Sequence, residues 1–115
     1  MTAVDWASSG DFLVVGDRAG FIYSVDAKTL KSMSSYKSTL SDPVKLLSWV
    51  EDVKISPNSQ LIVFGTHGGL SRVELVKVVD SGKKLQKIAA INVAISSALT
   101  HLDWTLDSQI VVINS

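Results

Sequence analysis

The stretch VDWASSGDFLVVG (residues 4–16) recurs as VKISPNSQLIVFG (residues 53–65) and again as LDWTLDSQIVVIN (residues 102–114). Since the copies begin at residues 4, 53 and 102 and contain no gaps, the period is 49 residues. Self-similarity at a fixed period of this length is typical of solenoids, propellers and other repeat arrays. The three copies therefore predict a structural unit that is repeated along the chain.

Each copy combines an alternating segment with a continuous apolar run. Alternating apolar and polar residues, as in Val4-Asp5-Trp6, have the period of a strand with one buried face. The apolar runs at residues 12–15, 61–64 and 110–113 must be covered on both faces. Small polar residues between the two segments favour a turn, and Pro57 fits the second position of a type I turn. Four-stranded sheets stacked around an axis satisfy all of this, so we predict an all-β chain with antiparallel β-propeller blades.

The repeat also predicts how the chain is divided into blades. Glycine-containing turns at residues 16–20 and 65–69 precede expected third strands at 21–25 and 70–79 and fourth strands at 30–36 and 85–91. We expect about two and a third blades: blade 1 at about residues 1–40, blade 2 at about 49–92 and a partial blade 3 at about 98–115. Residues 85–99 also have apolar side chains at helical spacings of three and four. The phase of the repeat favours strands there.

The composition excludes several classes of function. Eleven basic and eleven acidic residues give no net charge, whereas nucleic-acid-binding proteins usually carry a basic excess. The absence of cysteine excludes disulfides and thiolate metal sites. No signal peptide is recognisable, and the most apolar window, residues 88–99, is too short to cross a bilayer. We therefore expect neither nucleic acid nor membrane as a partner.

Candidate binding residues lie in the turns, where propeller loops meet ligands. Asp17 and Arg18 lie in the first glycine-containing turn, His67 lies in the second, and Lys83 and Lys84 follow a Ser-Gly turn. We predict these five residues as a partner-binding rim, although a solvated hairpin tip or strand edge explains each of them more simply. Neither histidine has a carboxylate pair at ligand spacing, and no nucleophile elbow or phosphate-binding loop is present. We predict no catalytic residue, metal or cofactor.

Three further stretches carry a resemblance to a known family: TAVDW (residues 2–6), VVGDRAG (residues 14–20) and SALTHLDW (residues 97–104). They resemble the echinoderm microtubule-associated protein-like family of WD-repeat propellers, and the resemblance covers essentially the whole chain. The Trp-Asp pair that closes the third strand of a typical blade corresponds to Val25-Asp26 in the first unit and to Glu74-Leu75 in the second. Packing, rather than the usual buried hydrogen-bond network, must therefore hold these blades together.

The resemblance implies a non-enzymatic protein-binding scaffold in the cytoplasm, associated with the cytoskeleton, which binds tubulin, microtubules or associated proteins. The residues themselves suggest an alternative, an assembly element. Two and a third blades cannot close a ring, so we expect the isolated chain to self-associate and complete a propeller with other copies or chains. An enzyme, such as a propeller hydrolase, is a third possibility, but the sequence contains no recognisable nucleophile and base.

Overall fold

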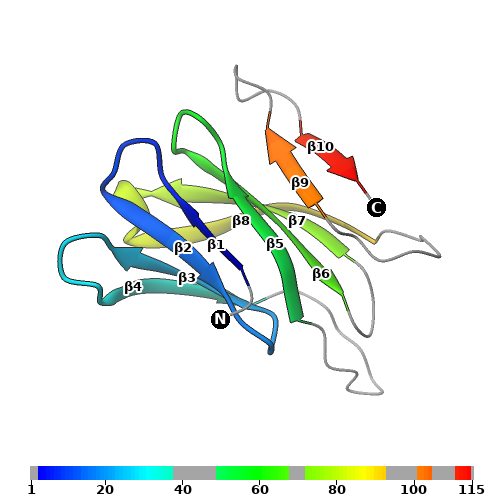
Figure 1. Ribbon diagram of the computed structural model, residues 1–115, viewed down its shortest axis with the longest axis horizontal. Helices are drawn as coiled ribbons and strands as arrows, with labels where there is room; N and C mark the ends of the chain where they lie inside the picture. Colours follow the sequence, from blue (N-terminus) through cyan, green and yellow to red (C-terminus); the bar gives the residue numbers. More distant parts are fainter. Residues whose placement is uncertain (1–2, 38–48, 68–71, 93–100, 105–110, 115) are drawn as a thin grey trace.

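The computed structural model describes residues 3–37, 49–67, 72–92, 101–104 and 111–114. These residues form ten β-strands and one short 3₁₀ helix: β1 (Ala3–Trp6), β2 (Phe12–Gly16), β3 (Phe21–Asp26), β4 (Ser32–Lys37), β5 (Trp49–Ile55), β6 (Leu61–His67), β7 (Arg72–Val79), η1 (Asp80–Gly82), β8 (Lys84–Asn92), β9 (His101–Trp104) and β10 (Val111–Asn114). The strands make two four-stranded antiparallel sheets, β1-β2-β3-β4 and β5-β6-β7-β8, and a two-stranded sheet of β9 and β10. Figure 1 shows the three sheets following one another in chain order. The predicted all-β fold is confirmed.

Equivalent turns open the first two sheets. The Gly10 N–H donates to the Ala7 carbonyl at 3.0 Å, and the Ser59 N–H donates to the Ser56 carbonyl at 2.8 Å. Gly10 has a φ of 79°, a conformation that glycine adopts without a steric cost. Pro57 occupies the second position of its turn, as predicted from the sequence.

Strand pairing corrects one equivalence between the two blades. Phe12 pairs with Asp26, whereas Leu61, its counterpart 49 residues later, pairs with Lys77. The counterpart of Val25-Asp26 is therefore Val76-Lys77 and not Glu74-Leu75. The reason is a longer second connection: five residues separate Gly16 from its partner Ile22, and seven separate Gly65 from its partner Val73.

Two strand boundaries differ from those expected. Strand β4 begins at Ser32 because Leu30 still belongs to the preceding turn, with a φ of 59° and an N–H donated to the Asp26 carbonyl at 2.8 Å. Strand β6 continues through His67, whose backbone pairs with Trp49, so the predicted turn at residues 65–69 is wrong for its first three residues. Residues 68–71 lie outside the described part of the chain.

The ambiguity between strand and helix is resolved where the structure describes it. Strand β8 pairs along its length with β7, so the predicted strand at residues 85–91 is confirmed. Residues 93–100 lie outside the described part of the chain, as does the loop around Pro43.

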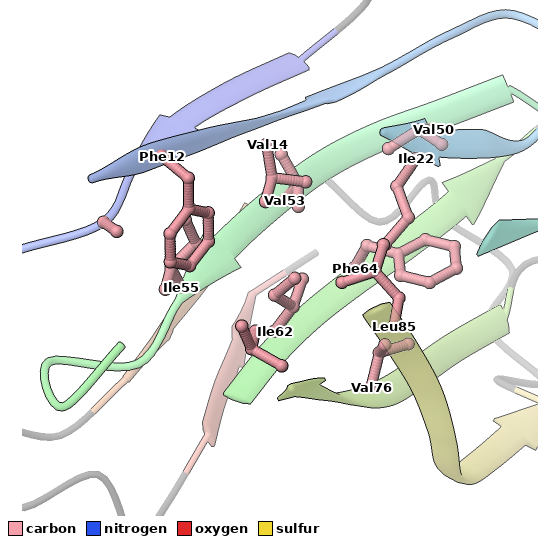
Figure 2. Close-up of a cluster of buried hydrophobic side chains, with 12 residues drawn as sticks. Phe12, Val14, Ile22, Val50, Val53, Ile55, Ile62, Phe64, Val76 and Leu85 are labelled. Carbon is pink, nitrogen blue, oxygen red and sulfur yellow. The ribbon is translucent and has the colours of Figure 1, made fainter. Parts of the chain in front are cut away.

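The main hydrophobic core fills the space between the first two sheets. Phe12, Val14 and Ile22 of the first sheet face apolar side chains of the second, including Phe64 (Figure 2). Tyr36 packs edge-on against the Phe64 ring, with 5.9 Å between the ring centroids. Full burial of a single large apolar side chain contributes about 1.5–3 kcal/mol, so this layer is a large part of what holds the sheets together.

One glycine allows the close approach of the two sheets. A Cβ atom on Gly16 would lie 2.5 Å from Cγ1 of Val50, which is fully buried. The Val50 N–H donates to the Asp17 carbonyl at 3.0 Å at the same point. Any larger residue at position 16 would force the sheets apart or displace Val50.

The opposite face of the second sheet is also covered. Val63 and Val73 are buried there, with Leu75 and Trp104 packed against them. The Trp104 indole N–H donates to the Lys54 carbonyl at 3.1 Å, which ties β9 to β5. The apolar run of β6 is therefore covered on both faces, as the sequence pattern predicts.

Candidate interaction surface

The connections between strands lie at two opposite ends of the sheets. We call the end that carries the β1–β2, β3–β4, β5–β6 and β7–β8 connections the hollow end, because a surface hollow lies there, and the end that carries the β2–β3 turn the opposite end (Figure 1). Asp17 and Arg18 lie at the opposite end, where His67 also falls by strand register. Lys83 and Lys84 lie at the hollow end. The five residues predicted as one rim are thus split between two ends.

Asp17 organises its own turn. Its carboxylate accepts hydrogen bonds from the N–H groups of Ala19 and Phe21, at 2.9 and 3.0 Å, and from the Tyr23 hydroxyl at 3.0 Å. The hydrogen bond to the Asp17 carboxylate raises the pKa of the Tyr23 hydroxyl, and partial burial raises it further. Most of the carboxylate's capacity to accept hydrogen bonds is therefore used within the hairpin. Arg18, next to it, is exposed to solvent.

Lys83 and Lys84 form an exposed basic pair beside η1. Lys83 ends the 3₁₀ helix, and its N–H donates to the Asp80 carbonyl at 3.2 Å. Both side chains are exposed, so both are available to an acidic partner segment.

A surface hollow of about 590 Å³ lies at the hollow end, between the turns of the first and second sheets. Its lining is mostly polar and comes from three connections. The β1–β2 and β5–β6 turns contribute Ser9, Asp11, Phe12, Asn58, Ser59 and Gln60, and the β7–η1 segment contributes Lys77, Val78, Val79, Asp80 and Ser81.

Hydrogen bonds between the turns hold the walls of this hollow. The Ser8 hydroxyl donates to the Pro57 carbonyl and lies 3.0 Å from the Ser59 hydroxyl. The Ser9 N–H approaches the Ser59 hydroxyl at 3.3 Å, and the Val78 N–H donates to the Gln60 carbonyl at 2.9 Å. Because the walls bond to each other across the two sheets, the hollow is built into the packing of the blades.

The lining of the hollow is rich in groups that can form hydrogen bonds. It offers hydroxyl and amide groups, the carboxylates of Asp11 and Asp80 and the ammonium group of Lys77. Such a mixture can hydrogen-bond a polar peptide or a loop of another protein. Among the described residues, no three His, Cys, Asp or Glu side chains gather closely enough to hold a metal ion. The same part of the chain contains no helix of the length and hydrophobicity needed to cross a membrane.

Sequence reasoning did not identify the hollow. Ser9 and Asn58 stand at the same phase of the repeat, so the meeting of these two turns could have been expected from the 49-residue period. The contribution of Lys77 to Ser81 could not, because it depends on how far the β7–β8 hairpin extends beside the neighbouring sheet.

Comparison with known proteins supports the fold and a distant relationship. Echinoderm microtubule-associated protein-like 1 of Mus musculus and of Homo sapiens is 28% identical to this chain over 109 residues. The match covers 93% of the chain but only 12% of the relatives, so the chain spans about an eighth of their length. The chain matches no protein-family profile.

Solved structures show the same architecture at low sequence identity. The RRP9 WD40 repeats superpose with a TM-score of 0.77 and 14% identity, over 96% of this chain and 33% of that one. The Cps50 (Swd1) β-propeller domain of Myceliophteria thermophila gives 0.70 and 16%, over 97% and 35%. A putative 6-phosphogluconolactonase from Bacteroides fragilis gives 0.78 and 13%, over 96% and 30%. At such identities the likeness concerns the fold alone. The chain therefore has the fold of a β-propeller segment and distant sequence similarity to echinoderm microtubule-associated protein-like 1.

Proposed function

We propose that the chain is part of a non-enzymatic protein-binding scaffold that binds microtubules, tubulin or microtubule-associated proteins. The observation that carries this proposal is the similarity to echinoderm microtubule-associated protein-like 1, which extends over 93% of the chain. The mostly polar hollow and the exposed Lys83 and Lys84 beside it support a protein partner.

The hollow end is the better candidate for the binding surface. Asp17, at the opposite end, already accepts three hydrogen bonds within its own hairpin. The hollow end combines a concave surface, groups that can hydrogen-bond and an exposed basic pair. Binding residues in proteins often lie on loops that a rigid scaffold holds in place.

Co-sedimentation of the 115-residue chain with stabilised microtubules at low salt tests the proposal. We expect the pelleted fraction to rise with microtubule concentration above the fraction that pellets when the chain is centrifuged alone. The absence of any such rise at low salt would contradict binding to microtubules.

Two charge-reversal variants test which end binds. Lys83→Glu/Lys84→Glu changes the hollow end, and Arg18→Glu changes the opposite end; all three side chains are exposed, so both variants should fold. We expect the lysine variant to weaken binding several-fold, because charges at the edge of an interface steer association, and the arginine variant to bind like wild type. The reverse result would move the binding surface to the opposite end.

A further inference from the structure

The η1 turn, Asp80–Gly82, has a left-handed backbone at three successive residues. Asp80 and Ser81 have φ values of 51° and 54°, a region in which the Cβ atom of an ordinary residue crowds the carbonyl oxygen that follows. Gly82 continues the turn with a φ of 98°. Asp80 and Ser81 both line the hollow. Strain of this kind persists only where the surrounding structure imposes it, and it often marks a functional site.

Contacts with the first sheet hold this turn. Gly82 is buried, and its carbonyl accepts a hydrogen bond from the hydroxyl of Ser24 on β3, which is fully buried as well. The fit around the glycine is tight, since a Cβ atom at position 82 would lie 3.0 Å from Cε of Met33 and 3.2 Å from Cγ of Phe12. Ser24, Met33 and Phe12 belong to three strands of the first sheet, whereas the turn connects β7 and β8 of the second. The strained turn is therefore held across the boundary between the blades.

The two ends of the turn are fixed from different sides. At its entry, the Val78 N–H donates to the Gln60 carbonyl of the β5–β6 turn at 2.9 Å. At its exit, the hydrogen bond from the Ser24 hydroxyl fixes Gly82. Removing the Ser24 hydroxyl would leave a buried carbonyl without this donor, so we expect the exit of the turn to move in response.

We propose that Ser24 is a positioning residue for the binding surface at the hollow end. Its hydroxyl holds the η1 turn in the conformation that places Asp80 and Ser81 in the wall of the hollow and Lys83 and Lys84 beside it. The inference rests on the proposed function, because it assigns that surface to binding. Ser24 is itself buried and out of reach of a partner, so its effect on binding passes through the turn.

Amide hydrogen exchange, followed by NMR, tests the hold on the turn without any partner. The reporter is the Lys83 N–H, which donates to the Asp80 carbonyl at 3.2 Å. We expect Ser24→Ala to speed its exchange roughly 2- to 10-fold relative to the amides of β6, the effect of losing one hydrogen bond near it. Ser24→Thr keeps the hydroxyl and should leave this ratio unchanged. The matched control is Tyr23→Phe, which removes the neighbouring hydroxyl of β3, bonded to Asp17 at the opposite end, and should also leave the ratio unchanged.

Co-sedimentation of the same variants with stabilised microtubules then separates positioning from stability. We expect Ser24→Ala to weaken binding several-fold, and Ser24→Thr to bind like wild type even though its additional methyl group should lower stability in a fully buried site. A merely structural role predicts instead that binding falls in step with stability in both variants. Urea unfolding of each variant supplies the stability for this comparison. Tyr23→Phe should bind like wild type.

Gly82→Ala is a second test in case Ser24→Ala does not fold. The added methyl group would meet Met33 and Phe12 and displace the turn while the Ser24 hydroxyl stays in place, so exchange at Lys83 should again rise and binding should weaken. An unchanged exchange ratio in Ser24→Ala, or binding by this variant that equals that of wild type, would overturn the inference. Failure of wild type to pellet with microtubules would count against the proposed function alone, and the exchange ratio would still decide whether Ser24 holds the turn.

Discussion

The two four-stranded sheets are built from the same repeat, yet their equivalent residues have different environments. Val53 and Ile55 of β5 are buried against the first sheet, whereas Val4 and Trp6 of β1 are about half exposed. The local pattern of alternating residues is the same in both strands. The comparison shows that the pattern determines which face of a strand is apolar, while the neighbouring sheet determines whether that face is buried.

The two sides should differ most in how much stability is lost when an aromatic ring is removed from each of them. Phe64→Ala removes a buried ring that contacts Tyr36, and we expect a loss of about 3–5 kcal/mol in the free energy of unfolding. Phe21→Ala removes a partly buried ring that stacks on Tyr23, on the side of the first sheet that faces away from the second sheet, and we expect a loss of about 1 kcal/mol. Urea unfolding of the two variants and of wild type, followed by circular dichroism, measures both losses. Equal losses would show that the two faces are equally well packed.

The close contact between the sheets should respond to added volume. Gly16→Ala places a methyl group against Val50, and we expect a loss of about 1–3 kcal/mol from overpacking. In a double-mutant cycle, Val50→Ala should offset part of that loss, because it removes the atoms that the new methyl group meets.

Gly10→Ala is the contrasting control for this cycle. Beyond the adjacent residues, no atom lies within 4 Å of the place that the added methyl group would occupy, so its cost comes from the positive φ of the turn alone. Val50→Ala should not reduce the stability loss caused by Gly10→Ala. If the losses caused by Gly16→Ala and Val50→Ala simply add in the double variant, the two residues are not in close contact.

The two tryptophans at equivalent positions offer a smaller and more specific contrast. Trp104→Phe removes the hydrogen bond to the Lys54 carbonyl, and we expect a loss of about 1 kcal/mol. Trp6→Phe should change the free energy of unfolding by less than about 0.5 kcal/mol, since Trp6 is 55% exposed. Thermal and urea unfolding of the two variants at low protein concentration compare them. A loss at position 6 as large as that at position 104 would mean that the folded chain buries Trp6.

The smallest effect concerns Asp26, whose counterpart in the second sheet is Lys77. The Asp26 carboxylate accepts hydrogen bonds from the N–H groups of Thr29 and Lys28, and these bonds lower the pKa of Asp26 below its ordinary value. The resulting stabilisation is complete above the pKa of the unfolded chain and is lost as the pH falls through the folded value. Wild type should therefore lose slightly more stability than Asp26→Asn between neutral pH and about pH 3. Parallel pH profiles from urea unfolding would contradict this.

Several features of the fold could be predicted from local patterns in the sequence. The 49-residue period predicted equivalent strands, and Pro57 predicted the turn between β5 and β6. The apolar runs of β2 and β6 predicted strands that face neighbours on both sides, which the structure confirms for β6. These features depend on local periodicity and turn chemistry, which neighbouring residues specify on their own.

The candidate surface was harder to predict, because it depends on how connections meet in space. The sequence placed Asp17, Arg18, His67, Lys83 and Lys84 on one rim, but the alternating direction of antiparallel strands puts the two lysines at the other end. His67 was expected in a turn, yet its backbone pairs with Trp49, a residue far from it in the sequence. The hollow arises only because the β7–η1 segment lies beside two turns of different sheets.

The amino-acid sequence alone determined the repeat, the strands and the apolar face of each strand, because these follow from residue spacing and backbone preferences. The tertiary structure alone decided which equivalent residues are buried, where Gly16 must stay small, and which turns enclose the hollow. The physical reason is that burial and close approach are properties of two surfaces in contact, and the second surface lies tens of residues away along the chain.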